Sequence, residues 1–216
     1  LGRASDVALV PAPPVDQIPA LSGYHEFFEE QGCQGHRELA YAVLAIQLAL
    51  ADAGLPTPES RNGAGLVQAF EAPGVESTVS RLFGMMSMPL PPGGPPPIYD
   101  LLSPSFYSMQ PFVYVQVLGK AFDLNGFSTS VHNACSSGAL SIEIAAQRIR
   151  SGDADLMVVA GAEAFDTAVR LEWFNRLELY AKDAADMRPF DANTRGFYVG
   201  EGGAALVLES EARARG

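Results

Sequence analysis

An uninterrupted apolar run, Leu156 to Ala160, lies between Asp155 and Gly161. A strand that is apolar at every position, and not only at alternate ones, is typical of a strand covered by helices on both faces of its sheet. The run follows a segment with helical periodicity, and Ala204 to Leu208 is expected to form another buried strand further on. Helices that alternate with fully buried strands predict a layered α/β sheet.

The remaining pattern supplies further elements and one long irregular stretch. Residues 1–35 contain four prolines and are predicted to be loop-like. A helix apolar on most sides is predicted over His36–Asp52, ended by Gly54 and Pro56. We also expect a strand over Gly63–Phe70 and a helix over Ser108–Phe122, with Pro111 in its first turn.

A cysteine separates a predicted strand from a predicted helix. The strand, Phe127–Val131, follows the turn pair Asn125-Gly126, and the helix has a mostly apolar face from Ala139 to Ile149. Cys135 therefore lies where the first helical N–H groups lack partners, and the positive end of the helix dipole is expected to favour the thiolate. The same N–H groups are placed to stabilise an oxyanion on an acyl group. The chemical interpretation is a nucleophile; the alternative is a buried structural cysteine.

Composition narrows the class of protein. The chain has 216 residues, of which 48% are hydrophobic and 18% charged, so it is long and apolar enough to bury a sizeable core. No apolar stretch approaches the roughly 20 residues of a membrane-spanning helix, and no signal segment is evident. The net charge of −11 argues against a nucleic-acid partner. We expect a cytoplasmic protein, in which the two cysteines do not mark a disulfide framework.

Several other polar residues are site candidates. His25 and His36 are interpreted as surface residues, whereas His132, three residues before the cysteine, is a secondary candidate for a catalytic role. Glu163, at the end of a predicted strand, is better interpreted as a structural hydrogen-bonding residue than as an acid, because buried carboxylates are costly unless paired. No metal-ligand spacing is present.

Five sequence blocks follow one another along the chain: Asn133–Gly138 around the cysteine, the helix end Arg148–Asp155, the strand Leu156–Glu163, the run Arg188–Asp191, and the glycine-rich turn and strand Gly196–Glu209. Together, in this order and at this spacing, they resemble the N-terminal half of a β-ketoacyl synthase, a condensing enzyme of the thiolase-like superfamily.

The resemblance implies a fold and a reaction. The fold is a thiolase-like layered αβαβα arrangement, a mixed sheet covered by helices, of which residues 36–216 form the first half only. Residues 1–35 are interpreted as a loop-rich leader or a truncated start of the domain. The implied activity is decarboxylative Claisen condensation of acyl and malonyl thioesters in fatty acid or polyketide biosynthesis. Cys135 would accept the acyl chain, and no metal or resident cofactor is expected, because the substrate arrives on the phosphopantetheine of a carrier protein.

The resemblance also implies partners. An acyl carrier protein is expected to dock on basic residues near the site, for which Arg170, Arg176, Lys182 and Arg188 are candidates. Glu178 stands where many relatives have a basic residue, a departure from the family's usual docking contact, and Arg176 is the candidate substitute. A C-terminal half or subunit with two histidines would complete the enzyme, which is inactive without it. A homodimer or a heteromer is expected.

The same residues leave two other functions open. The first is a non-condensing partner subunit of the chain-length-factor kind, although such relatives typically lack the cysteine. The second is a thiolase-family acyltransferase, which would transfer acyl groups without releasing carbon dioxide.

Overall fold

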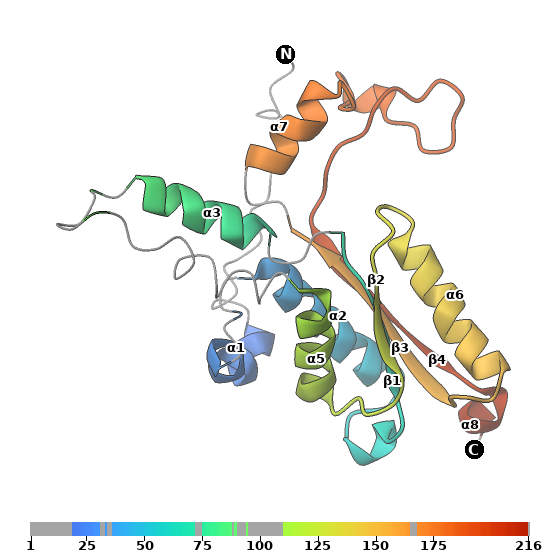
Figure 1. The fold of residues 1–216 in the computed structure, drawn as a ribbon. Helices are drawn as coiled ribbons and strands as arrows, with labels where there is room; N and C mark the ends of the chain where they lie inside the picture. Colours follow the sequence, from blue (N-terminus) through green and yellow to red (C-terminus); the bar gives the residue numbers. More distant parts are fainter. Residues whose placement is uncertain are drawn as a thin grey trace.

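A four-stranded mixed sheet is the centre of the molecule (Figure 1). The computed structural model describes residues 19–30, 33, 36–71, 75–87, 89, 94, 110–164 and 168–215. The strands are β1 (Gly65–Ala69), β2 (Ser128–Val131), β3 (Leu156–Glu163) and β4 (Gly202–Glu209), in the order β2-β1-β3-β4. The strand β1 pairs in parallel with β2 and β3, and β4 is antiparallel to β3. The expected mixed α/β sheet is confirmed.

Helices cover the two faces of this sheet unequally (Figure 1). The helices α2 (Arg37–Asp52) and α5 (Pro111–Phe122) pack on one face, and α6 (Ser137–Arg150) packs on the other. The larger core lies on the α2 and α5 side and includes Ile46, Leu66 and Leu118. Among the described residues, the core under α6 has five buried members: Val67, Val131, Ala145, Met157 and Val159. The α6 side is therefore the thinner half of the core.

Local sequence signals account for several element boundaries. Pro111 is the first residue of α5, where its missing N–H costs no helical hydrogen bond. The Asn125-Gly126 turn leads into β2, and the Gly126 N–H donates to the Ala64 carbonyl at 2.8 Å. A Cβ atom on Gly126 would lie 2.4 Å from the carbonyl oxygen of Gly63, so only glycine fits this approach.

Two sequence predictions are wrong in part. Residues 19–30 are not loop-like, because they form the 3-10 helix η3 (Pro19–Tyr24) and the helix α1 (His25–Glu30). The strand β4 is not fully buried, and Leu206 within it is 49% exposed. In the described sheet β4 pairs with β3 alone, and α6 lies mainly over the other strands. The apolar residues of β4 are therefore not covered as those of a central strand would be.

A long excursion separates β3 from β4. It contains α7 (Ala168–Arg176) and the 3-10 helix η5 (Ala184–Asp186), and it stands away from the sheet (Figure 1). Within this excursion, the ring of Phe174 in α7 makes edge-to-face contacts with the rings of Tyr180 and Phe197. Gly196 has a φ of +81°, and a Cβ there would lie 2.4 Å from the Ala181 nitrogen. The remaining short elements are η4 (Glu59–Arg61), α3 (Val75–Met86) and α8 (Glu211–Arg215).

Candidate active site at the start of helix α6

Three parallel strands end at one edge of the sheet, and chemically active side chains follow them. In sheets of this kind the carboxyl ends of parallel strands are the usual place for a ligand site. Glu163 ends β3, and its Oε1 accepts a hydrogen bond from the Glu71 N–H, just after β1, at 2.7 Å. This bond agrees with the structural role that the sequence predicts for Glu163.

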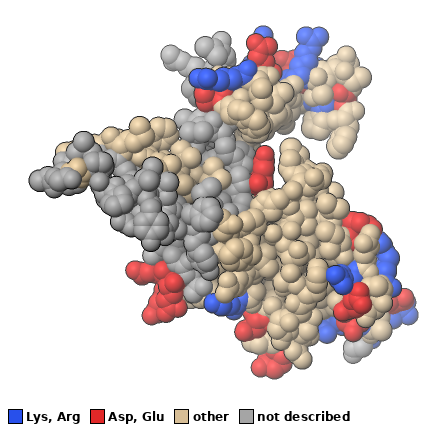
Figure 2. Space-filling model, viewed as in Figure 1, with Lys and Arg blue, Asp and Glu red and all other residues tan. Residues whose placement is uncertain are grey.

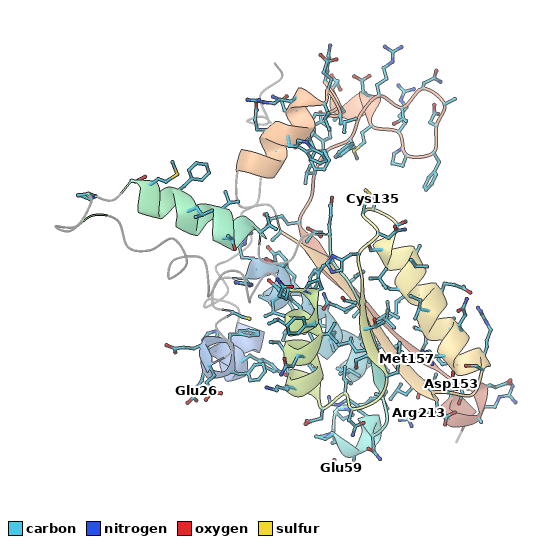
Figure 3. The ribbon with its side chains drawn as sticks, viewed as in Figure 1. Glu26, Glu59, Cys135, Asp153, Met157 and Arg213 are labelled. Carbon is cyan, nitrogen blue, oxygen red and sulfur yellow. The ribbon has the colours of Figure 1, made fainter. Side chains whose placement is uncertain are left out.

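Cys135 lies at the same edge, in the connection from β2 to α6. Its thiol is free and the residue is exposed, so the alternative of a buried structural cysteine is wrong. Figure 3 shows the residue at the tip of the turn that precedes α6. The surface over this turn and the first turns of α6 is largely uncharged in Figure 2, whereas charged residues gather over the α7 segment and at the far end of α6.

The turn that carries Cys135 has an unusual backbone conformation fixed by two serines. Ala134 has a φ of +47°, in the left-handed region that residues with a Cβ rarely adopt. The Ser137 hydroxyl accepts a hydrogen bond from the Asn133 N–H at 2.7 Å and donates to the Ala134 carbonyl at 2.7 Å. The Ser136 hydroxyl accepts from Asn133 Nδ2 at 2.7 Å and donates to the Asn133 carbonyl at 2.8 Å.

These serine contacts were not predicted as part of the site. The sequence signal that would have found them is local: serine and asparagine side chains readily bond the backbone a few residues away at turns and helix starts. Asn133 and Ser137 are four residues apart on either side of the cysteine.

The second cysteine has a very different environment. Cys33 is 2% exposed, and its carbonyl accepts a hydrogen bond from the His36 N–H at 3.2 Å. Burial, with a smaller contribution from the negative charge of Glu38, raises the pKa of the Cys33 thiol to about 11. This thiol is therefore protonated over the physiological pH range.

A buried polar network lies beside Cys33. The Tyr114 hydroxyl is hydrogen-bonded to His36 Nδ1 and donates to Glu38 Oε1 at 2.8 Å. Tyr114 is fully buried, and its ring makes an edge contact with Phe70 at a centroid distance of 4.9 Å. The interpretation of His36 as a surface residue is wrong: it is 5% exposed, because its ring is bonded to a tyrosine 78 residues away.

The other candidates lie on the surface or outside the description. His132 is exposed just after β2, and His25 is half-buried as the first residue of α1. Arg176 is ion-paired with Glu172 at 3.0 Å, and Lys182 and Arg188 are exposed in the α7 excursion. Glu178 is exposed with a φ of +56°. The side chain of Arg170 lies outside the described residues.

No three His, Cys, Asp or Glu side chains in the described ranges are grouped as metal ligands. None of the helices formed by those residues is both long and apolar enough to cross a bilayer.

This arrangement provides an accessible sulfur at the start of a helix, at the edge of the sheet where strands end. At the start of α6 the N–H groups of Ser136 and Ser137 donate to the Asn133 and Ala134 carbonyls at 3.2 and 3.0 Å. Backbone N–H groups close to the sulfur are the kind of donor that stabilises a negatively charged oxygen. The chemistry that fits is attack of a thiolate on an activated carbonyl.

Comparison with known proteins agrees with this geometry. Residues 36–214 match the family model described as the β-ketoacyl synthase N-terminal domain. The chain is 32% identical, over 187 residues, to a 3-oxoacyl-[acyl-carrier-protein] synthase 2 of Rhizobium meliloti, covering 82% of this chain and 42% of that protein. A polyketide synthase of Burkholderia thailandensis is 37% identical over 111 residues, which is 51% of this chain and 2% of that protein.

Solved structures show the same fold. A β-ketoacyl synthase from Burkholderia phymatum superposes with a TM-score of 0.66 at 32% identity, covering 83% of this chain and 43% of that one. A type II polyketide ketosynthase, solved in complex with its acyl-carrier protein, gives a TM-score of 0.66 at 22% identity, covering 84% of this chain and 45% of that chain. The chain thus spans less than half the length of these relatives. It belongs to the β-ketoacyl synthase family and matches that family's N-terminal domain.

Proposed function

We propose that this chain is the nucleophile-bearing part of a ketosynthase that condenses acyl and malonyl thioesters carried on an acyl carrier protein. The observation that carries the proposal is the free, exposed Cys135 thiol in the turn between β2 and α6, in a chain of this family. Cys33 is a poor alternative nucleophile because its thiol is buried and its pKa is about 11.

The proposed reaction has two steps at one sulfur. In the first, the Cys135 thiolate attacks the carbonyl carbon of the acyl thioester, the new C–S bond forms, and the carrier thiolate leaves and takes up the proton that Cys135 lost. In the second, a malonyl thioester loses carbon dioxide, and the resulting carbanion attacks the acyl carbon on Cys135. The bond to Cys135 then breaks and the sulfur leaves as thiolate.

A second half with two histidines would assist decarboxylation. The exposed apolar residues of this chain are consistent with an interface for such a partner. Leu140 and Ile142 on α6 are each 40% exposed, and Leu206 on β4 is 49% exposed. Leu140 and Ile142 are two residues apart, so they lie on the two sides of α6 that flank the buried Ser141. Exposed apolar groups beside a largely uncharged surface are typical of an interface. We propose that the exposed surface of α6 is covered by the completing half, and that without it the chain is acylated but does not condense.

The carrier protein and a second copy are proposed to use other surfaces. Lys182 and Arg188 in the α7 excursion are the proposed contacts for an acidic carrier. In the described sheet β2 is an edge strand, and a groove of about 710 Å³ lies between it and α5, with Phe112 56% exposed along its wall. We propose that a second copy pairs with this edge, since an open strand edge is a template for another strand.

The test follows the acyl group and the carbon dioxide. The chain, together with any chain that copurifies with it, is mixed with acyl and malonyl carrier substrates, and Cys135 peptides, product and carbon dioxide are measured by mass spectrometry. A thioester on Cys135, followed by product and carbon dioxide, is expected. Full product from the Cys135→Ala variant would instead indicate a non-condensing partner subunit. Acyl transfer without carbon dioxide would indicate an acyltransferase.

A further inference from the structure

The peptide unit between Ala134 and Cys135 is held from one side by Ser137. The Ala134 carbonyl accepts the Ser137 hydroxyl at 2.7 Å and the Ser137 N–H at 3.0 Å. The same hydroxyl accepts a hydrogen bond from the Asn133 N–H at 2.7 Å. It therefore links the N–H of Asn133 to the carbonyl of Ala134, the residue with the left-handed φ. Ser137 is only 4% exposed, so water is poorly placed to replace these bonds.

The orientation of this carbonyl decides where the Cys135 amide points. The described peptide bonds are all trans, and in a planar trans peptide the C=O and N–H groups point in opposite directions. Because the Ala134 carbonyl points to the buried Ser137, the N–H of Cys135 points away from Ser137. A rotation of this peptide unit would turn the N–H inward and the carbonyl oxygen outward.

We propose that Ser137 is a positioning residue that holds the Ala134–Cys135 peptide with its amide facing the incoming acyl group. The inference rests on the proposed function, since it concerns acylation of Cys135. An outward amide stabilises the oxyanion that develops when a thiolate attacks a thioester, whereas an outward carbonyl oxygen would repel it. Ser137 acts through the peptide and does not itself touch the substrate.

Two other serines of the same segment provide matched controls. The Ser136 hydroxyl also makes two hydrogen bonds in the turn, but both go to Asn133 and neither reaches the Ala134–Cys135 peptide. Ser141 is fully buried one turn further along α6, and its Oγ has no hydrogen-bond partner among the described residues. Alanine at either position leaves both hydrogen bonds from Ser137 to the Ala134 carbonyl in place.

The experiment compares two reactions of one sulfur. Ser137→Ala, Ser137→Thr, Ser136→Ala and Ser141→Ala are made in the native gene, and each protein is purified with any chain that accompanies it. Acylation of Cys135 by an acyl N-acetylcysteamine thioester develops an oxyanion, whereas its alkylation by iodoacetamide displaces iodide at a saturated carbon and develops none. Both rates are read from Cys135 peptides by mass spectrometry.

Ser137→Ala is expected to slow acylation at least about 10-fold, below the roughly 10²–10³ of a complete loss of one oxyanion donor because the Ser137 N–H still holds the carbonyl. Its alkylation should change less than about 3-fold, and Ser137→Thr, which keeps the hydroxyl, should restore acylation. Ser141→Ala should behave as wild type. Ser136→Ala, which leaves both hydrogen bonds to the Ala134 carbonyl in place, should slow acylation less than Ser137→Ala does.

Three results would overturn the proposal. In the first, Ser137→Ala is acylated at the wild-type rate. In the second, the rates of acylation and alkylation fall by the same factor, as expected if the substitution only disorders the first turn of α6 around Cys135. In the third, the wild-type protein takes up no acyl group on Cys135, and this result contradicts the proposed function as well.

Discussion

Cys33 and Cys135 lie in similar positions in the chain, each in a short connection that leads into a helix, but their surroundings differ. Cys33 is 2% exposed beside the buried network of His36, Tyr114 and Glu38, and the pKa of its thiol is about 11. Cys135 is exposed at the edge where the parallel strands end. A position before a helix therefore does not make a cysteine reactive: access and the surrounding groups decide.

The largest expected effect is on condensation itself. Replacing Cys135 by alanine removes the only accessible thiol in the described part of the chain, and product formation should fall by about 10³-fold or more. Product formation is measured with the complete set of carrier substrates. The matched control is Cys33→Ala, which should keep most of the activity, and a comparable loss in that control would break the contrast between the two cysteines.

Direct chemical labelling sharpens the same contrast. At pH 9, two units below its pKa of about 11, only about one Cys33 thiol in a hundred is ionised, and burial also blocks the reagent. We expect iodoacetamide to modify Cys135 about 100-fold faster than Cys33 in the folded protein. In denaturant the two rates should converge. Equal rates under native conditions would show that the Cys33 thiol is accessible to the reagent.

The buried network near Cys33 should matter for stability and not for chemistry. Tyr114→Phe removes the hydroxyl that joins His36 to Glu38, so each of these buried side chains loses one hydrogen bond. The free energy of unfolding should fall by about 1–3 kcal/mol, measured by urea denaturation. Tyr41→Phe, which removes a half-buried hydroxyl bonded to Glu201 at 3.1 Å, is the matched control and should cost less. Acylation of Cys135 should stay unchanged in the Tyr114→Phe variant, and loss of acylation there would link the two regions.

The expected effect confined to the narrowest range of conditions is on the stability at alkaline pH. The pKa of Cys33 is raised from 9.0 to about 11 on folding, so the unfolded chain gives up this proton at lower pH than the folded one. Stability from this site is complete below pH 9 and is lost as the pH rises through 11. The free energy of unfolding should therefore fall less steeply over this range in Cys33→Ala than in wild type. Parallel curves for the two proteins would mean that the thiol is not buried.

The sequence predicted most of the sheet because its signals are local. The apolar run at Leu156 and the turn at Gly126 each determine their own element, and β3 and β2 lie where they were expected. Helix α5 begins at Pro111, within the expected range, while the first residues of that range lie outside the description. The helices within residues 19–30 were missed, since they are too short for helical periodicity to be evident.

The site was predicted less completely for a physical reason. The place of Cys135 between strand and helix follows from the adjacent sequence, but the burial of His36 depends on Tyr114, and nothing in the local sequence indicates that contact. Likewise, the apolar residues of β4 indicate a strand, but whether a helix covers Leu206 depends on elements distant in the chain.

The central claim is tested most directly with proteins that keep a single thiol. Cys33→Ala and Cys135→Ala are each incubated with an acyl-carrier thioester, and the intact mass of each protein is measured before and after hydroxylamine treatment. The account predicts one hydroxylamine-sensitive acyl group on the protein that keeps Cys135 and none on the protein that keeps Cys33. Acylation of the protein that keeps only Cys33, or of neither protein when the completing half is present, would contradict it.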